Sequence, residues 1–288
     1  MTHYAILAGS SSNVEVATSY YTRTSGSGTQ SVPSGYNAIH VQYAVGGGGG
    51  GLRGIDYDKA GGESSGGGGG AGAYISDKIF TVAAGETITW TVGAAGSKNG
   101  ATFSGNSGSN GGQTKISGSS TGTIFTLNGG SRATITSNGG VQGPVRQSAA
   151  GSGGSVSHID TSITSGTFLD SSYNVETISS SNSELKGGPR GTFNTSGSGG
   201  NGALQAGSHP NQGSCAGDNC QISGNAGGSS YAGAVAGGAA ATTGNNGTNP
   251  AGNGSRGSGG GGGGAQGGSG LGGNGGSGEM KYRFLYVF

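Results

Sequence analysis

The chain has 288 residues, 73 of them glycine, with 9% charged residues and a formal net charge of +1. This low charge excludes a highly charged disordered tail and argues against nucleic acid as a partner, because phosphate binding depends on clustered basic residues. Hydrophobic residues make up only 30% of the sequence, so side-chain burial alone cannot order the whole chain. No apolar stretch approaches the about 18 residues of a membrane helix, and the N-terminal residues lack the features of a secretory signal peptide.

Alternation of apolar and polar residues predicts strands, and no long α-helix is expected. The predicted strands are, in chain order, Val14–Arg23, Asn37–Val45, Lys78–Val82, Thr87–Val92, Thr123–Leu127, Arg132–Thr136 and Met280–Phe288. The third and fourth are predicted to form a hairpin that turns near Gly85, and the fifth and sixth a hairpin that turns at Asn128–Gly130.

Two of these strands have a clear face. In Asn37–Val45, alternation places Ile39, Val41, Tyr43 and Val45 on one side. In the last strand the residues that share a face are all aromatic: Tyr282, Phe284, Tyr286 and Phe288. We expect this C-terminal strand to pair and to be buried.

Glycine runs lie between the strands, at Gly46–Gly51, Gly66–Gly70 and Gly259–Gly264, and glycine recurs at every third residue from Gly261 to Gly276. Three residues per turn is the geometry of an extended polyproline II-type helix. Five prolines are too few for collagen. Extended glycine helices can pack side by side and hydrogen-bond to each other, which would satisfy their backbone groups. The alternative is a flexible linker; the strand that follows the last run favours the packed helices.

Four longer segments are irregular and varied, and such loops on a rigid frame commonly carry binding: Leu52–Ser65, Ser97–Asn110, Val145–Arg190 and Gln205–Ile222. Aromatic rings in polar loops give large contact area at small entropic cost. The candidate receptor-binding residues are therefore Arg53, Tyr57, Phe168, Tyr173, Arg190, His209 and Tyr231, with the two arginines suited to phosphate groups. The alternative for each residue is that it covers the core or fills a gap between extended helices.

Catalytic and metal-binding patterns are weak. Gly62–Gly66 matches G-x-S-x-G but lacks the strand and helix that a nucleophile elbow needs, and glycine abundance makes such matches expected by chance. The histidines are far apart, and no pair of carboxylates stands out. Cys215 and Cys220 form an isolated C-x4-C pair, which favours free thiols or one small disulfide over a metal site. We expect no enzyme activity, no cofactor and no metal.

Residues 31–100 carry a recognisable pattern. The V-P-S-G of Val32–Gly35 opens a strand that enters a glycine run, and Gly85–Gly93 follows as G-E-T-I-T-W-T-V-G. This pattern resembles the glycine-rich domain of bacteriophage tail proteins. The remainder resembles the small adhesins at the tips of T-even-type long tail fibres. Those adhesins share a tryptophan-containing attachment region, whereas the single tryptophan here is Trp90, inside the predicted hairpin.

The resemblance implies stacked polyglycine II helices whose connecting loops contact a host receptor. We therefore predict an all-β fold in which β-sandwich-like strands enclose a bundle of polyglycine II helices, with irregular connecting loops. Residues 1–30 would be an N-terminal attachment segment and 31–288 the receptor-binding domain. The protein would be a tail-tip or tail-fibre adhesin of the virion, assembled in the host cytoplasm. Its partners would be a tail-fibre or tail-tip protein and a bacterial outer-membrane protein or surface polysaccharide, with no nucleic acid and no membrane insertion. The alternative is a purely structural virion component without a ligand.

Overall fold

The computed structural model describes residues 17–52, 66–98, 108–140, 143–149, 151–160, 165–169, 175–179, 227, 238, 252–260 and 271–287. The described residues include the strands given below and contain no helix. The strands are β1 (Tyr21–Arg23), β2 (Ser27–Ser31), β3 (Ala38–Val45), β4 (Tyr74–Thr81), β5 (Thr87–Thr91), β6 (Thr114–Gly118), β7 (Gly122–Leu127), β8 (Thr134–Gly140), β9 (Gly143–Ala149), β10 (Val156–Ile159), β11 (Ser165–Leu169), β12 (Val175–Ser179) and β13 (Glu279–Leu285).

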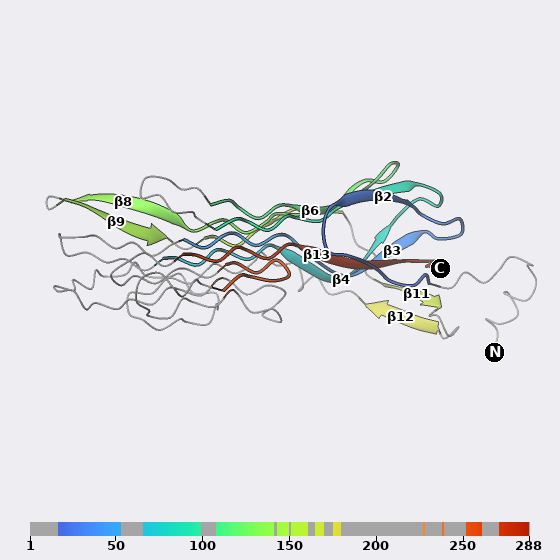
Figure 1. Cartoon of the computed structure of the whole chain (residues 1–288). Coiled ribbons are helices and arrows are strands. Elements are labelled where there is room, and N and C mark those ends of the chain that lie inside the picture. The colour runs from blue at the N-terminus through green and yellow to red at the C-terminus, as the bar shows by residue number, and fades with distance from the viewer. Residues whose placement is uncertain are drawn as a thin grey trace, which may run out of the picture.

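Two antiparallel sheets pack face to face at one end of the molecule (Figure 1). One has the strand order β1-β13-β3-β4 and the other β10-β7-β6-β5-β2. Their shared core is apolar and contains Ile39, Phe80, Ile116, Phe125 and Tyr282, all fully buried. The core joins strands far apart in sequence, because the C-terminal β13 lies between β1 and β3.

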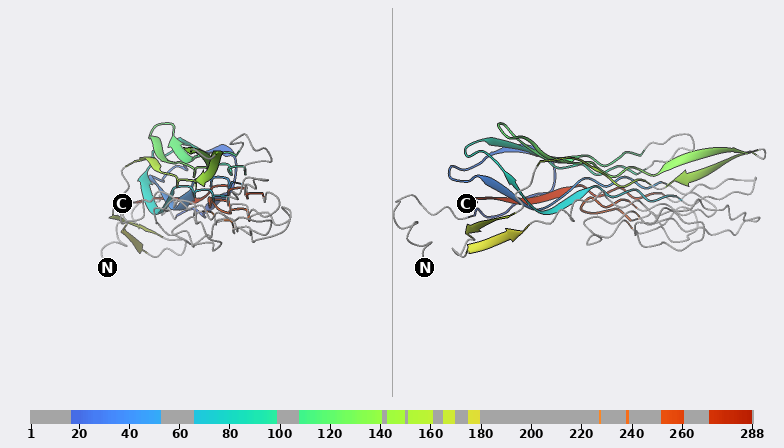
Figure 2. Two further views of the ribbon diagram at one scale, coloured as in Figure 1. Left: turned by 90° about the vertical axis from the view of Figure 1, so that its left-hand side faces the viewer. Right: turned by 180° about the vertical axis from the view of Figure 1, so that it is seen from behind.

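Glycine-rich segments run out of the sandwich along its strand direction (Figures 1 and 2). We define the glycine-rich bundle as residues 46–52, 66–73, 93–98, 108–113, 128–133, 151–155, 252–260 and 271–278. Strands β3, β5 and β7 end at one edge of the sandwich and continue into the bundle, and β4, β6, β10 and β13 begin there. The expectation that strands enclose the bundle is therefore wrong: the bundle extends the sandwich instead, because the same chain segments form both.

The strands predicted at Asn37–Val45 and Met280–Phe288 are confirmed as β3 and β13. The predicted face of β3 holds only in part: Ile39 and Val41 join the core, but so does Ala44 instead of Tyr43. The register of β3 against β13 shifts by one residue beside Val41, and this bulge inverts the alternation. Tyr286 lies beyond the end of β13 and is 40% exposed, so its predicted burial is wrong.

The N-terminal strand is shorter than predicted, because β1 covers only Tyr21–Arg23. Both β1 and β2 pair within the sandwich, with β13 and β5 respectively. The described part of the predicted attachment segment thus contributes to the two sheets. Its role in attachment stays a prediction.

Neither predicted hairpin forms. Strands β4 and β5 belong to different sheets, so the turn at Gly85 (φ 77°) crosses between the sheets. Residues Asn128–Gly130 do not turn: the Asn128 N–H donates to Ser155 O and the Gly130 N–H to Gly47 O, as part of the bundle. At Asn128–Gly130 the local turn signal failed because long-range backbone pairing competed with it. Strands β10, β11 and β12 and most of β9 also lie in Val145–Arg190, which was predicted to be irregular.

Backbone hydrogen bonds order the described glycine runs, with a repeat of three residues. The N–H groups of Gly46, Gly49 and Leu52 donate to one neighbouring segment, at Ala73, Gly70 and Gly67. Those of Gly47 and Gly50 donate to a second segment, at Gly112 and Ser109. Those of Gly48 and Gly51 donate to a third, at Gly276 and Gly273. Successive residues therefore face three directions in turn, and the flexible-linker interpretation does not hold for these segments.

The segment 46–52 is surrounded by neighbours on all sides. Its carbonyl groups accept hydrogen bonds from three further segments, through the N–H groups of Gly96, Gly130, Ala133 and Gly260. Six segments thus hydrogen-bond to this central one. All of its N–H groups and the C=O groups of residues 47–50 bond to neighbouring backbones. These bonds offset the cost of burying polar groups with almost no help from side chains.

Steric contact explains why positions in the central segment are glycine. A Cβ added at Gly48 would lie 1.8 Å from Ser258 O, and one at Gly50 would lie 1.8 Å from Ser97 O. At Gly47 and Gly49 the nearest atoms are again carbonyl oxygens, 2.1 and 2.0 Å away. Any side chain at these positions would push neighbouring backbones apart and break their hydrogen bonds.

Glu86 anchors the connection between β4 and β5 to the turn after β6. Its carboxylate accepts hydrogen bonds from the N–H of Ala83 (2.7 Å), Ser120 (3.0 Å) and Thr121 (3.1 Å), and from the Thr121 hydroxyl. Burial raises the pKa of Glu86, but these hydrogen bonds from Thr121, Ser120 and Ala83 outweigh it and hold the pKa below its ordinary value of 4.5.

Gly48→Ala should destabilise the protein far more than a glycine replacement at a surface turn. The added methyl group meets a rigid carbonyl in the bundle, so we expect a loss of about 3 kcal/mol or more in the free energy of unfolding. Gly122→Ala is the matched control: its φ is 82° but no atom lies within 4 Å, so only backbone strain of about 1 kcal/mol applies. Urea denaturation measures both, and equal losses would contradict the packing seen here.

Glu86→Gln should lower stability by about 2 kcal/mol at neutral pH, because an amide nitrogen cannot accept these N–H groups. A lowered pKa means that the ionised carboxylate stabilises the fold above pH 4.5, and that this contribution is lost as the pH falls below 4.5. The variant should therefore lose less stability than the parent chain on acidification from pH 5 to pH 3. Thermal unfolding at several pH values measures the difference, and parallel curves would count against the assignment.

Candidate functional site

Chain connections gather at the end of the bundle away from the sandwich, which we call the distal end. The chain leaves the described part at Leu52 and re-enters at Gly66, and these two ends are joined by the Leu52 N–H to Gly67 O bond of 2.9 Å. It leaves again at Lys98 and re-enters at Gly108, next to the pairing of Ser97 with Ser109. A third connection is the hairpin of β8 and β9, which lies at this end in Figure 1.

The seven predicted receptor-binding residues fall at different places. Arg53 and Tyr57 are in the first distal connection, but they lie outside the described residues, as do Tyr173, Arg190, His209 and Tyr231. Phe168 is in β11, opposite Glu176 of β12. That hairpin lies at the sandwich end of the molecule and not at the distal end (Figure 1).

Two rows of polar side chains cross the bundle surface. In the row nearer the sandwich, Gln113 donates to Asn128 and Asn128 to Ser155, each over 2.9 Å. The other row lies further from the sandwich, with the Ser97 hydroxyl donating to that of Ser109 (3.1 Å) and the Arg132 N–H to the Asn110 side chain (3.0 Å). The sequence patterns did not identify these polar residues as a surface feature. Their signal was the small polar residue placed between glycines, as in Gly151-Ser-Gly-Gly154-Ser.

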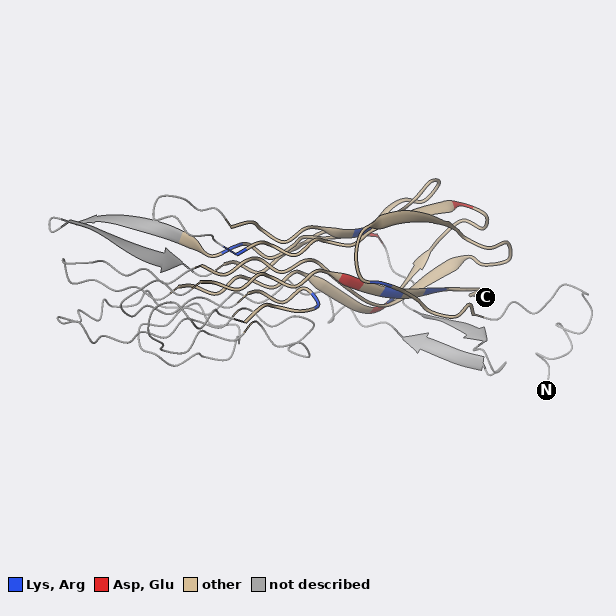
Figure 3. Ribbon diagram, viewed as in Figure 1, with Lys and Arg blue, Asp and Glu red and all other residues tan. Residues whose placement is uncertain are grey.

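The described bundle carries few charges, as Figure 3 shows. Among its segments the cations are Lys98, Arg132 and Arg256, and no acidic residue occurs. The Arg132 guanidinium donates to Gly108 O over 2.5 Å. The surface can therefore offer hydrogen bonds but little net electrostatic attraction.

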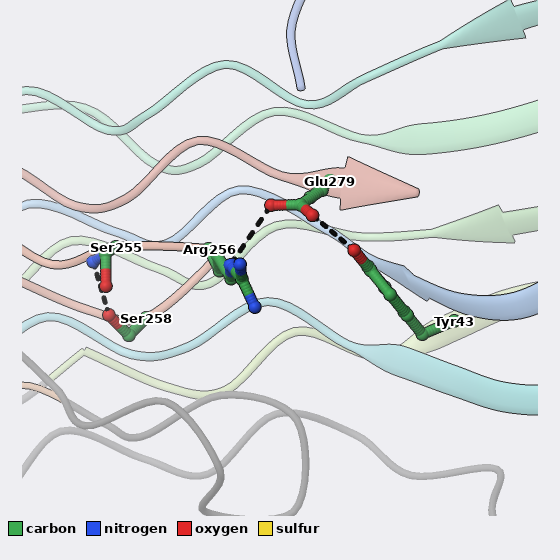
Figure 4. A network of polar contacts seen from close by, with 5 residues as sticks. All are labelled: Tyr43, Ser255, Arg256, Ser258 and Glu279. Atoms are coloured by element: carbon green, nitrogen blue, oxygen red, sulfur yellow. Dashed lines mark hydrogen bonds and ion pairs between the residues drawn. The ribbon is translucent and has the colours of Figure 1, made fainter. Parts of the chain in front are cut away.

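A polar network fixes the bundle to the sandwich (Figure 4). Arg256 occupies a tight turn at a φ of 41°, and its Nε lies 3.2 Å from Glu279 Oε2. The hydroxyl of Tyr43 donates to the other oxygen of Glu279, whose side chain is 10% exposed. The Ser255 N–H donates to the Ser258 hydroxyl within the same turn. Both carboxylate oxygens are thus occupied by protein groups, which suits an anchor rather than a catalytic acid.

A second cluster covers the outer face of the β1-β13-β3-β4 sheet. The Tyr20 hydroxyl lies 3.2 Å from His40 Nδ1, and Lys281 and Arg283 lie 4.8 and 4.7 Å from the centre of the Tyr20 ring. His40 Nε2 is 3.6 Å from Asp77 Oδ1. Burial, together with the charge of Arg283, lowers the pKa of His40 to about 4. A histidine that is neutral at physiological pH and enclosed in this way acts as a packing residue.

The sequence predicts no metal site. Within the described ranges, no three His, Cys, Asp or Glu side chains gather as metal ligands would. Cys215 and Cys220 lie outside those ranges. The described residues include no helix with the length and apolar character needed to cross a membrane.

The sequence pattern of a glycine-rich domain family matches residues 22–285. The chain belongs to this glycine-rich domain family. The match begins in β1 and ends at the last residue of β13, and these two strands pair in the sandwich. It therefore spans both sheets and the bundle. No curated protein is significantly similar to the chain.

His40→Gln should lose less stability than the parent chain on mild acidification. Because the folded-state pKa is about 4 and the ordinary value is 6.5, the unfolded chain binds a proton first as the pH falls. The fold therefore loses up to about 3 kcal/mol between pH 6.5 and pH 4, and keeps its full stability above pH 6.5. The variant should lose that much less over this interval in denaturant titrations at each pH. An unchanged pH dependence would show that His40 is not held neutral.

Proposed function

We propose that the protein is a bacteriophage tail-tip or tail-fibre adhesin that binds a bacterial surface receptor through connections held at the distal end of the bundle. The observation that carries this proposal is that the segments flanking residues 53–65 and those flanking 99–107 pair with each other at the same end of the bundle as the β8–β9 hairpin. Loops presented by a rigid frame lose little entropy on binding, which raises affinity. The resemblance of residues 31–100 to phage tail glycine-rich domains supports the virion context.

We further propose that the bundle segments are polyglycine II helices. The three-residue repeat of hydrogen bonds and the six neighbours of segment 46–52 support this assignment, because a helix with three residues per turn faces three directions in turn. Such a rod needs no apolar core, so its length can grow without large side chains. It would hold the distal end away from the virion.

The roles of the two ends follow from this arrangement. The distal connection that contains Arg53 and Tyr57 would contact the receptor, an outer-membrane protein or a surface polysaccharide. The sandwich end, which carries residues 17–31, would contact a tail-fibre or tail-tip protein. Several copies on one virion would convert weak single contacts into avid attachment. The function requires no catalysis and no cofactor, and the protein would act on the virion after assembly in the host cytoplasm.

Replacing a distal connection tests the proposal. A chain in which residues 53–65 become a Gly-Ser linker of the same length should keep its unfolding temperature, since the flanking segments pair independently of the linker sequence. Its binding to host cells should fall at least tenfold in a flow-cytometry assay with the labelled protein. A second variant with residues 99–107 replaced shows whether more than one connection contributes.

The control is Ser31→Arg, an exposed position in β2 at the sandwich end, which should bind cells as the parent chain does. If no host strain binds the parent chain, a purely structural virion component replaces the adhesin. If both distal variants bind normally, recognition lies elsewhere on the molecule.

A further inference from the structure

We propose that the outer edge of β8, the edge that does not pair with β9, binds an extended strand of a proteinaceous receptor by adding it to the β8–β9 hairpin. This inference rests on the proposed function and names the receptor class and the contacting element. Strands β8 and β9 pair over seven positions, from Thr134 opposite Ala149 to Gly140 opposite Gly143. They form a sheet of two strands only, with no third strand among the described residues.

The position of the hairpin suits a first contact. Segment 128–133 leads from the bundle into β8, and β9 returns toward residues 151–155 of the bundle. Figures 1 and 2 place the hairpin at the distal end, away from both sheets of the sandwich. A receptor strand could therefore approach without meeting the sandwich.

A hairpin of two strands is marginally stable by itself in water. Its stability increases when a third strand hydrogen-bonds to the backbone groups at its edge. Each strand of an isolated pair presents a row of N–H and C=O groups on its outer side. Strand addition to such an edge is a recurring mode of peptide recognition, in which backbone hydrogen bonds supply affinity. The hairpin thus has a physical reason to take a partner.

The two strands differ in how their edges are protected. Proteins protect exposed edges with proline and with charged residues. Strand β9 contains both, as Pro144 and Arg146. Strand β8 reads Thr-Ile-Thr-Ser-Asn-Gly-Gly and contains neither. Its β-branched residues Thr134, Ile135 and Thr136 favour strand pairing. This asymmetry identifies β8 as the edge left open for pairing.

The chemistry of the edge also selects the ligand class. A row of backbone donors and acceptors at the regular spacing of a strand matches the backbone of another extended chain, whereas the hydroxyl groups of a sugar polymer do not repeat at that spacing. The strand carries no charge that would attract phosphate or lipid head groups. An extended segment of a surface protein, such as an exposed loop or strand edge, fits it best.

Proline substitutions at two adjacent positions test the edge. Successive residues of an antiparallel strand direct their N–H groups to opposite sides. One of the two variants, Thr136→Pro or Ser137→Pro, therefore removes an inner N–H, which faces β9. The other removes an outer N–H, on the free side of β8. The variant that loses an outer N–H should keep the hairpin, seen by its backbone chemical shifts, yet bind cells at least tenfold more weakly. Thr136→Lys should also weaken binding, because a charged residue on an edge strand disfavours the addition of another strand.

The reverse change is the matched control on β9. Pro144→Val with Arg146→Thr leaves β8 intact, so binding should not fall. The labelled chain is tested on intact host cells and on cells whose surface proteins have been removed with proteinase K, and only the first should bind. Two results would overturn the strand-addition inference while leaving an adhesin. One is binding to cells treated with proteinase K. The other is unchanged binding by both Thr136→Lys and the proline variant that keeps the hairpin. Absence of binding to every intact host strain would overturn the adhesin proposal and this inference with it.

Discussion

The fold depends on one constraint: peptide groups in the bundle must hydrogen-bond to other peptide groups, because few side chains are present to do so. Six segments surround residues 46–52 and bond to them through N–H or C=O groups. This requires backbones to approach so closely that even a methyl group would collide, as at Gly48. Glycine loses more entropy than other residues on ordering, and the dense backbone pairing offsets that loss.

The sandwich supplies what the bundle lacks, an apolar core that fixes the order of the segments. Residues at the junction connect the two parts. The buried Thr114 hydroxyl donates to Val45 O and accepts from the Gly93 N–H, so it links three segments where they leave the sheets. Arg256 and Glu279 fix a fourth segment beside them. Side-chain burial at one end thus sets the register, and backbone hydrogen bonds carry that register along the rod.

This division of roles suits a protein that presents loops at a distance. The rod requires glycine at its centre, where a Cβ atom would collide with neighbouring carbonyl groups. Sequence change would then be tolerated better in the connections than at the centre of the rod. The open edge of β8 and the distal connections would then be two recognition elements on a single support, one using backbone groups and the other side chains.

The sequence by itself determined the strands with strong local alternation, such as β3 and β13, and the packing of a glycine run such as Gly46–Gly51. These features are local, because alternation and glycine spacing set which faces can pack. Only the tertiary structure decided that Gly85 turns between sheets, that Asn128–Gly130 stays extended, and that β8 and β9 project at the distal end. Partners from distant parts of the chain, such as Gly47 for Gly130 and Ser155 for Asn128, determine these outcomes. A turn signal specifies a few residues, whereas backbone pairing along the whole bundle outweighs it.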